Sequence, residues 1–201
     1  YTHNKGETRK EIIKDFEKLG YKVDCKILNS ADYGVPQVRK RVIFIGTSTN
    51  QKIEFPPKEV ENYISVKEAL STYPKLKSGE ESSIPNHIAM SHSEQMLTKM
   101  SYVSDGGDRN EIPVKIRPTS GDVRKYIKYA SSKPSVCVTG DMRKIFHYEQ
   151  NRALTVRELA KLQSFPDDFI FRGNRISQQQ QVGNSVPPKM AEAIAKLIIK
   201  M

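Results

Sequence analysis

The sequence predicts an α/β fold that carries an inserted, loop-rich domain. An amphipathic helical pattern comes first, followed by an alternating strand and then by an apolar strand. Regular periodicity is lost from residue 47 to residue 151, and helical patterns return after that point. Helices and strands that alternate along a chain are typical of α/β domains. We therefore expect residues 1–46 and 152–201 to form one domain and residues 47–151 to form the insert.

The first elements follow from changes in apolar spacing. Thr8 and Glu11 fit a capping box, and the helical spacing of the apolar residues that follow predicts a helix over residues 8–19. The period then changes to two, which predicts a strand over residues 21–27. Residues 42–45 are apolar throughout, which is typical of a strand covered on both faces.

The insert contains two short helical patterns and a basic stretch. Ser65 and Glu68 fit a capping box, and residues 93–100 predict another helix. In residues 115–144 basic side chains outnumber acidic ones, with tyrosines between them; the basic residues are Lys115, Arg117, Arg124, Lys125, Lys128, Lys133, Arg143 and Lys144. Such a stretch fits a nucleic-acid face, and a solvated basic surface explains it equally well.

Two helices are expected in the C-terminal region. Thr155 and Glu158 fit a capping box, and the helix that they begin should end near Phe165. The last helix should begin at Pro187 and Pro188, because the first N–H groups of a helix need no partner within it.

Composition limits the partners. The chain has 33 Lys and Arg residues against 23 Asp and Glu, a formal charge of +10, which favours a polyanion such as nucleic acid. Cys25 and Cys137 have no metal-ligand spacing, so we expect neither zinc nor a disulfide framework.

No leader or membrane-length apolar run is present, so the expected location is cytoplasmic. Tyr1 in place of Met suggests one piece of a larger polypeptide.

The first candidate for chemistry is the segment 32–41, which leads into the apolar strand. In an extended chain Gln37, Arg39 and Arg41 project to the same side, so an amide and two guanidinium groups would converge on one surface. Such a row suits a phosphate, a carboxylate or a base oxygen. Taken alone, it is also typical of a solvated strand entrance.

Two further segments contain polar or charged residues that could bind a ligand or contact the insert. Residues 181–188 read as a Gly-Asn turn that leads into a helix N-terminus, where Asn184 and Ser185 could bind a polar or anionic ligand. An ordinary helix cap is the alternative. In residues 152–169, Arg157 and Glu158 read as helix-surface charges that could tether the insert.

In this order and at these intervals, the three segments resemble the cytosine-5 DNA methyltransferase family. Residues 31–46 are similar to its conserved block VIII, residues 152–169 to block IX and residues 181–188 to block X. That family places its target-recognition domain between blocks VIII and IX, which here means residues 47–151. Three blocks in the right order are far more specific than any one of them.

The resemblance implies a fold, a cofactor and roles for residues. The fold would be part of a doubly wound methyltransferase domain that binds S-adenosylmethionine, with a DNA-reading domain across a cleft. Gln37, Arg39 and Arg41 would belong to the catalytic group, with Arg41 at O2 of a cytosine flipped from double-stranded DNA and Arg39 supporting the catalytic loop or a phosphate. Asn184 and Ser185 would line the cofactor pocket.

Other parts of the family pattern are absent from this chain. The family nucleophile lies in a Pro-Cys dipeptide, whereas Cys25 follows Asp24 and Cys137 follows Val136. The Phe-x-Gly-x-Gly and Glu-Asn-Val blocks are also missing from the sequence. We therefore expect a fragment that is inactive alone and needs the N-terminal catalytic portion of the same enzyme, or a complementary subunit.

DNA contacts are expected in the recognition region. The candidates are Gly106, Gly107, Cys137, Thr139, Arg143 and Lys144. Cys137 falls where the family has Thr, and the loop residues after it could reach the major groove. The histidines there, His87, His92 and His147, are expected at the surface or in hydrogen bonds and not as bases.

The resulting hypothesis is the C-terminal segment of an enzyme that methylates carbon 5 of cytosine in a specific DNA sequence, within a restriction-modification system. The alternative is a stand-alone nucleic-acid-binding module without catalysis. A regulatory scaffold that does not bind nucleic acid is a third interpretation, and it predicts no salt-dependent affinity for DNA.

Overall fold

A computed structural model describes residues 6–119 and 125–200 of the chain, so Arg124 of the basic stretch lies outside the described residues. The N-terminal part is a helix followed by a two-stranded ribbon. Its elements are α1 (Glu7–Lys18), β1 (Lys22–Asn29), the 3-10 turn η2 (Ser30–Tyr33) and β2 (Lys40–Thr47). β1 and β2 pair antiparallel, from Lys22 opposite Thr47 to Asn29 opposite Lys40.

The start of α1 differs from the prediction. Its N-cap is Gly6, in the left-handed region at φ 86°, and no side chain caps the helix. The predicted capping box of Thr8 and Glu11 is therefore wrong, because Thr8 already lies in the first helical turn. The helix ends at Lys18, and Gly20, where the predicted helical pattern stops, follows with a φ of 84° that favours glycine.

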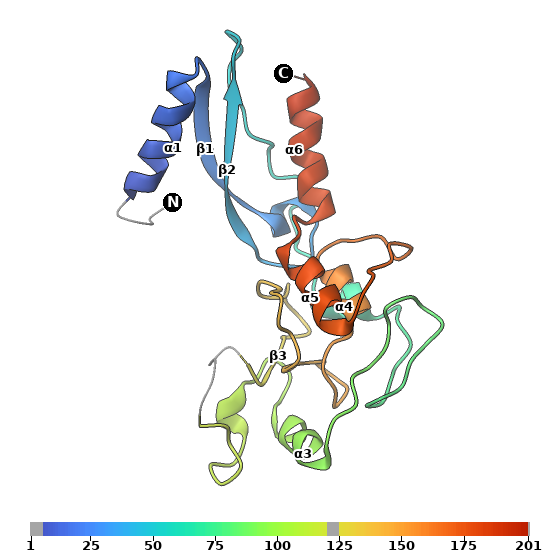
Figure 1. Cartoon of the computed structure of the whole chain (residues 1–201). Coiled ribbons are helices and arrows are strands. Elements are labelled where there is room, and N and C mark those ends of the chain that lie inside the picture. Colours follow the sequence, from blue (N-terminus) through green and yellow to red (C-terminus); the bar gives the residue numbers. More distant parts are fainter. Residues whose placement is uncertain (1–5, 120–124, 201) are drawn as a thin grey trace.

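Helices lie on the two sides of the ribbon. Figure 1 shows α1 beside β1 and α6 (Pro188–Lys200) beside β2. Of the apolar run 42–45 only Ile45 is fully buried, and the other three residues are half-buried. The strand is thus less covered than predicted. The two long strands are antiparallel, so they do not by themselves form the parallel sheet that the resemblance implies.

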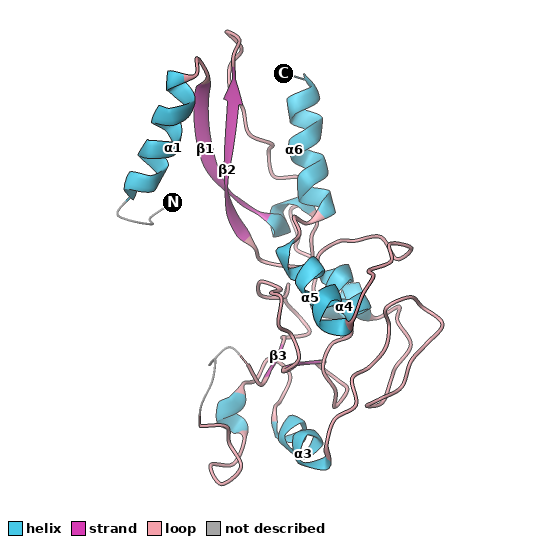
Figure 2. Cartoon of the chain, in the orientation of Figure 1, coloured by secondary structure: helices cyan, strands magenta, loops and turns pink. Residues whose placement is uncertain are grey.

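The middle of the chain is mostly loop, as predicted, and Figure 2 shows long irregular stretches between short helices. The capping box is confirmed: the Ser65 N–H donates to Glu68 Oε2 at 2.7 Å, and the Glu68 N–H donates to Ser65 Oγ at 3.2 Å. Ser93 caps the second predicted helix. The elements are α2 (Val66–Leu70), α3 (Glu94–Tyr102), η3 (Arg109–Glu111), β3 (Ile127–Lys128) and β4 (Ile145–Phe146).

The C-terminal region holds one helix more than predicted. The capping box of Thr155 and Glu158 begins α4 (Val156–Leu162), which ends slightly before the predicted Phe165. α5 (Arg175–Asn184) follows, capped by Asn174, and its sequence has no apolar stripe that would have predicted it. α6 begins at Pro188, as expected.

One hydrophobic core crosses the predicted domain boundary. Residues of α2 and of the segment 129–145 pack together with α4 and with Val182 of α5. A second cluster surrounds Met100 beside α3, and a third joins Leu28 of β1 to Met190 of α6. The loop-rich stretch is therefore packed directly on the C-terminal helices. That residues 47–151 form a separate domain stays a prediction.

Candidate functional site

The segment that enters β2 lies beside a segment from the middle of the chain. Gln37 forms a parallel bridge with Ser135: the Val38 N–H donates to the Ser135 carbonyl at 2.8 Å, and the Ser135 N–H donates to the Pro36 carbonyl at 3.0 Å. Residues almost 100 positions apart in the chain are thereby brought into register. We call residues 135–140 the recognition segment, because two predicted DNA-contact residues lie in it.

Gln37 is fully buried between the recognition segment and α4. Its Oε1 accepts from the Val138 N–H at 2.7 Å, and its Nε2 donates to Gln163 Oε1 at 2.8 Å and to the Leu162 carbonyl at 3.3 Å. Both ends of the side-chain amide are thus occupied inside the protein. Gln37 does not face the surface on which the sequence placed it.

Arg39 is also buried, with 6% of its surface exposed. Its Nη1 donates to the Val138 carbonyl at 3.0 Å and to Cys137 Sγ at 3.1 Å. Its Nη2 donates to the carbonyls of Gly183 at 3.0 Å and Ser185 at 3.3 Å. The guanidinium group therefore joins β2, the recognition segment and the end of α5, and the interpretation of a solvated strand entrance is wrong for this residue.

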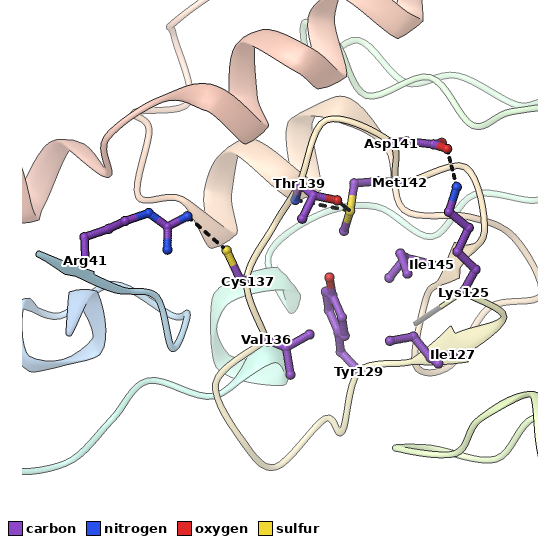
Figure 3. A pocket seen from close by; sticks show the side chains of 10 residues that line it. All are labelled: Arg41, Lys125, Ile127, Tyr129, Val136, Cys137, Thr139, Asp141, Met142 and Ile145. Atoms are coloured by element: carbon purple, nitrogen blue, oxygen red, sulfur yellow. Dashed lines mark hydrogen bonds and ion pairs between the residues drawn. The ribbon is translucent and has the colours of Figure 1, made fainter. Parts of the chain in front are cut away.

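Arg41 is the member of this row that reaches the surface. Its Nη1 donates to the Lys40 carbonyl at 2.8 Å, and its Nη2 lies 3.5 Å from Cys137 Sγ. Figure 3 shows the guanidinium group extending toward Cys137 at the edge of a pocket. Since the other donors of the guanidinium group face solvent, Arg41 can bind an oxygen of a ligand.

The pocket beside Arg41 has a volume of about 550 Å³. Its walls are mainly apolar, and polar groups lie at its edge (Figure 3). It is lined by Arg41, Lys125, Ile127, Tyr129, Val136, Cys137, Thr139, Asp141, Met142 and Ile145. Burial raises the pKa of Tyr129, so its hydroxyl stays protonated. A pocket with apolar walls and a few polar groups suits a small organic ring.

Asp141 and Lys125 form one edge of this pocket, and Arg143 pairs with the same carboxylate. Arg143 Nε donates to Asp141 Oδ1 at 2.9 Å, and Lys125 pairs with Asp141 Oδ2. Hydrogen bonds from Arg143 and Lys125 hold the pKa of Asp141 well below its usual range. Asp141 is therefore ionised, and it holds two basic side chains, of which Lys125 lines the pocket.

The predicted Gly-Asn turn is the end of a helix. Gly183 and Asn184 are the last residues of α5, and Ser185 follows in an extended conformation. The Ser185 hydroxyl donates to the Val182 carbonyl at 2.7 Å, and the Asn184 side chain is exposed. The turn is therefore a C-terminal cap that leads through two prolines into α6, and the Asn184 amide is accessible to a ligand.

The predicted DNA-contact residues fall into two groups. Cys137 and Thr139 line the pocket together with Arg41, whereas Arg143 and Lys144, which follow in the sequence, are not among its lining residues. Gly106 and Gly107 do not line that pocket; they form a turn whose Gly107 carbonyl accepts from the Lys128 N–H at 3.1 Å. The structure thus brings Arg41, Cys137 and Thr139 together, whereas the glycine turn is bonded to β3 and does not line the pocket.

The charges of α4 are not at the surface. Arg157 and Glu158 are 0% and 1% exposed, so their interpretation as helix-surface charges is wrong. Arg157 donates to the carbonyls of Pro85 at 2.9 Å and Pro166 at 3.0 Å. Sequence reasoning also missed Gln163 and Arg152, which are buried and hydrogen-bonded, because nothing local distinguishes them from surface residues.

The histidines of this region are hydrogen-bonded, as expected, and His87 and His147 are buried. His87 Nδ1 lies 2.8 Å from Ser82 Oγ, and His147 Nδ1 accepts from the Glu149 N–H at 3.1 Å. Within residues 6–119 and 125–200 no group of three or more metal-ligating side chains could hold a metal ion. Nor does a helix of that described part have the length and apolar character needed to span a membrane.

The chain is similar to solved structures of methyltransferases. The chain superposes with a TM-score of 0.72 on a DNA modification methyltransferase encoded within a prophage of E. coli, at 22% identity, covering 92% of this chain and 62% of that one. The Dnmt2 methyltransferase of S. pombe gives a TM-score of 0.57 at 18% identity, covering 96% of this chain and 61% of that one. The mixed α/β arrangement is thus one found in methyltransferases.

Sequence comparison identifies the family. The model of the C-5 cytosine-specific DNA methylases matches residues 1–200, and the chain belongs to that family. It is 64% identical to the type II methyltransferase M1.HphI of Haemophilus parahaemolyticus over 100% of this chain and 54% of that protein. It is 34% identical to M.DdeI of Desulfomicrobium norvegicum over 93% of this chain and 56% of that protein. The chain spans about half the length of these curated relatives.

Proposed function

We propose that this chain is the C-terminal segment of a DNA (cytosine-5-)-methyltransferase of a restriction-modification system. The complete enzyme transfers a methyl group from S-adenosylmethionine to carbon 5 of cytosine in a specific double-stranded DNA sequence. The observation that carries the proposal is the family match over residues 1–200, together with an exposed Arg41 at the edge of a pocket. The relatives are type II methyltransferases, which supports the same activity and context here.

Arg41 has the chemistry that the reaction requires. Attack on the cytosine ring at carbon 6 puts negative charge on the ring, and a guanidinium group at O2 stabilises that charge. Arg41 is exposed, and its contact to Cys137 Sγ at 3.5 Å leaves donors for a flipped base. In this proposal Cys137 and Thr139 form the recognition-side wall beside Arg41, while Arg143 and Lys144 contact DNA phosphates or base edges. Gly106 and Gly107 approach the duplex with their backbone.

Asn184 and Ser185 fit the cofactor side of the site. The Ser185 hydroxyl donates its proton to the Val182 carbonyl at 2.7 Å, so its oxygen can accept a hydrogen bond from a ligand. The exposed Asn184 amide can both donate and accept. These two residues would hold polar groups of S-adenosylmethionine, which supplies the methyl group when bound.

The proposal includes the division of the chain. Residues 1–46 and 152–201 belong to the catalytic domain, whose doubly wound sheet is completed by the N-terminal half of the enzyme. Residues 47–151 are the target-recognition domain, although they share a core with α4 and α5. The nucleophilic cysteine lies in the N-terminal half, since neither Cys25 nor Cys137 follows a proline. The chain alone is therefore inactive.

The test is complementation. The N-terminal half of the full-length enzyme is expressed separately, mixed with this chain, and assayed for transfer of a labelled methyl group to DNA. We expect each half alone to be inactive and the mixture to transfer methyl groups. If this chain binds DNA but the mixture and the intact enzyme transfer nothing, the binding-module alternative holds and the proposal is wrong.

A further inference from the structure

Two side chains, those of Gln37 and Gln163, connect the recognition segment to the C-terminal helices by a continuous path of hydrogen bonds. The Val138 N–H donates to Gln37 Oε1 at 2.7 Å, and Gln37 Nε2 donates to Gln163 Oε1 at 2.8 Å. Gln163 Nε2 then donates to the Val182 carbonyl at 2.7 Å, near the end of α5. Gln37 and Gln163 are both 0% exposed, so their amide groups depend on partners inside the protein; Gln37 Nε2 also donates to the Leu162 carbonyl at 3.3 Å.

Arg39 forms a second, shorter connection between the same two segments. One arm of its guanidinium group donates to the Val138 carbonyl at 3.0 Å, and the other donates to the Gly183 carbonyl at 3.0 Å. Val138 is therefore held from both sides, through its N–H by Gln37 and through its carbonyl by Arg39. Because a planar fork fixes the direction of both arms, this contact sets orientation as well as distance.

Gly183 sets how closely the two segments approach. A Cβ atom built on Gly183 would lie less than 3.0 Å from the backbone carbon of Thr139 and the nitrogen of Gly140. Real Cβ atoms essentially never lie so close to a backbone atom, so any other residue would force the segments apart. The end of α5 and the recognition segment are thus in direct backbone contact where Thr139 lines the pocket.

The geometry of the pocket depends on this contact. Cys137 Sγ lies 3.1 Å from Arg39 Nη1 and 3.5 Å from Arg41 Nη2, so the wall of the pocket and its exposed guanidinium group are adjacent. A shift of the recognition segment would move Cys137 and Thr139 relative to Arg41. Apolar residues of similar volume could fill the same space, but they would not fix one register between the segments.

We infer that Gln163 is a positioning residue: through Gln37, and together with Arg39, it holds the recognition segment at a fixed distance from Arg41 and from the end of α5. Gln163 lines no part of the pocket, yet it determines where Cys137 and Thr139 stand. This inference rests on the proposed function, because it treats Arg41 and the recognition segment as the two sides of a DNA-methylating site.

The test uses the full-length enzyme with Gln163→Leu, which removes both hydrogen bonds at similar volume. The first measurement is the ratio of kcat/KM for a cognate duplex to that for a duplex with one base pair changed. We expect this ratio to fall at least about 10-fold, because the wall that faces the base moves while Arg41 remains. Gly183→Ala disturbs the same contact from the other side and should reduce the ratio as well. Gln51→Leu, an exposed change beyond β2, should leave it unchanged.

The second measurement is hydrogen exchange of the Val138 amide in the same proteins. It needs no activity, so it separates a failure of this inference from a failure of the proposed function. We expect exchange to be at least about 10-fold faster in Gln163→Leu, since Gln37 Nε2 then keeps only its longer hydrogen bond to the Leu162 carbonyl and holds Oε1 less firmly at the Val138 N–H. Unchanged discrimination in folded Gln163→Leu and Gly183→Ala proteins would overturn the inference, and so would unchanged exchange at Val138. Should Gln163→Leu fail to fold, Gly183→Ala and Arg39→Lys, which replaces the planar fork with a single ammonium group, decide the question by the same two measurements.

Discussion

Arg152 and Glu158 form a two-point ion pair in the interior of the protein. Arg152 Nη1 lies 2.8 Å from Glu158 Oε2, Nη2 lies 2.7 Å from Oε1, and the two residues are 0% and 1% exposed. Glu158 Oε2 also accepts from the Thr155 N–H at 2.8 Å, so one carboxylate both caps α4 and neutralises a buried arginine. The start of α4 is thereby fixed to the loops that surround the recognition region.

Removal of one partner of this pair should strongly destabilise the protein. Arg152→Met leaves the Glu158 carboxylate buried without its cation, which costs on the order of 3–5 kcal/mol of unfolding free energy. Urea unfolding measures the loss. Lys75→Met, which breaks the exposed pair between Lys75 and Glu149, should cost less than about 1 kcal/mol. Equal losses of unfolding free energy in the two variants would contradict this stabilising role of the buried pair.

Stability should depend on pH through His147. Burial is the main cause that lowers the pKa of His147 to about 4, and its Nδ1 accepts from two backbone N–H groups, those of Glu149 and Gln150. Folding thus favours the neutral ring, while the unfolded chain binds a proton near pH 6.5. The stability that the neutral His147 ring contributes to the folded state is fully present above pH 6.5 and is lost as pH falls toward 4.

The measurement is the unfolding free energy between pH 7 and pH 5. In the unmodified protein it should fall as pH falls in this window. His147→Asn keeps an acceptor for the backbone N–H groups but does not titrate there, so its curve should be flatter. Parallel curves for the two proteins would show that His147 is not the group responsible.

Arg41→Ala should impair methyl transfer without affecting folding. The side chain is exposed and forms no buried contact, so the melting temperature should change little. Loss of its hydrogen bond to the charged ring should reduce the single-turnover rate of the full-length enzyme about 100-fold or more. Lys26→Ala, an exposed cation on β1, is the matched control and should keep the normal rate. A normal rate in Arg41→Ala would remove Arg41 from the site.

DNA affinity should fall as salt increases, and basic residues beside the pocket should set part of that dependence. Lys144 lies 4.8 Å above the ring of Tyr126, and Arg143 is exposed next to Asp141. Lys144→Ala should reduce the slope of log affinity against log salt by about 1 if the ammonium group contacts a phosphate. Lys18→Ala on α1 serves as the control. Identical slopes for both variants would exclude a phosphate contact of Lys144.

The sequence predicted elements whose signals are local. The capping boxes at Ser65 and Thr155 gave the starts of α2 and α4, because the same four residues form both hydrogen bonds. The box at Thr8 failed, because α1 has Gly6 as its N-cap, two residues before the predicted one. α5 was missed because its middle is a run of glutamines, and tertiary contacts of Gln179 and Val182 hold it in place.

The direction in which side chains face could not be predicted in the same way. Gln37, Arg39 and Arg41 occupy every second position, so an extended chain places them on one side. The residues that cover that side come from distant segments of the sequence. The partners of Gln37 are Val138 and Gln163, which lie 101 and 126 residues away in the sequence. Whether a polar row faces solvent or the interior depends on such contacts, and no local pattern contains them.

The most direct test of the account identifies the methylated base. Full-length enzyme that contains this chain is incubated with double-stranded DNA and labelled S-adenosylmethionine, and the DNA is then digested to nucleosides and separated by chromatography with mass detection. We expect the label to appear in 5-methyl-2′-deoxycytidine. Label in N4-methyl-2′-deoxycytidine or N6-methyl-2′-deoxyadenosine, or DNA that remains unlabelled, would contradict it.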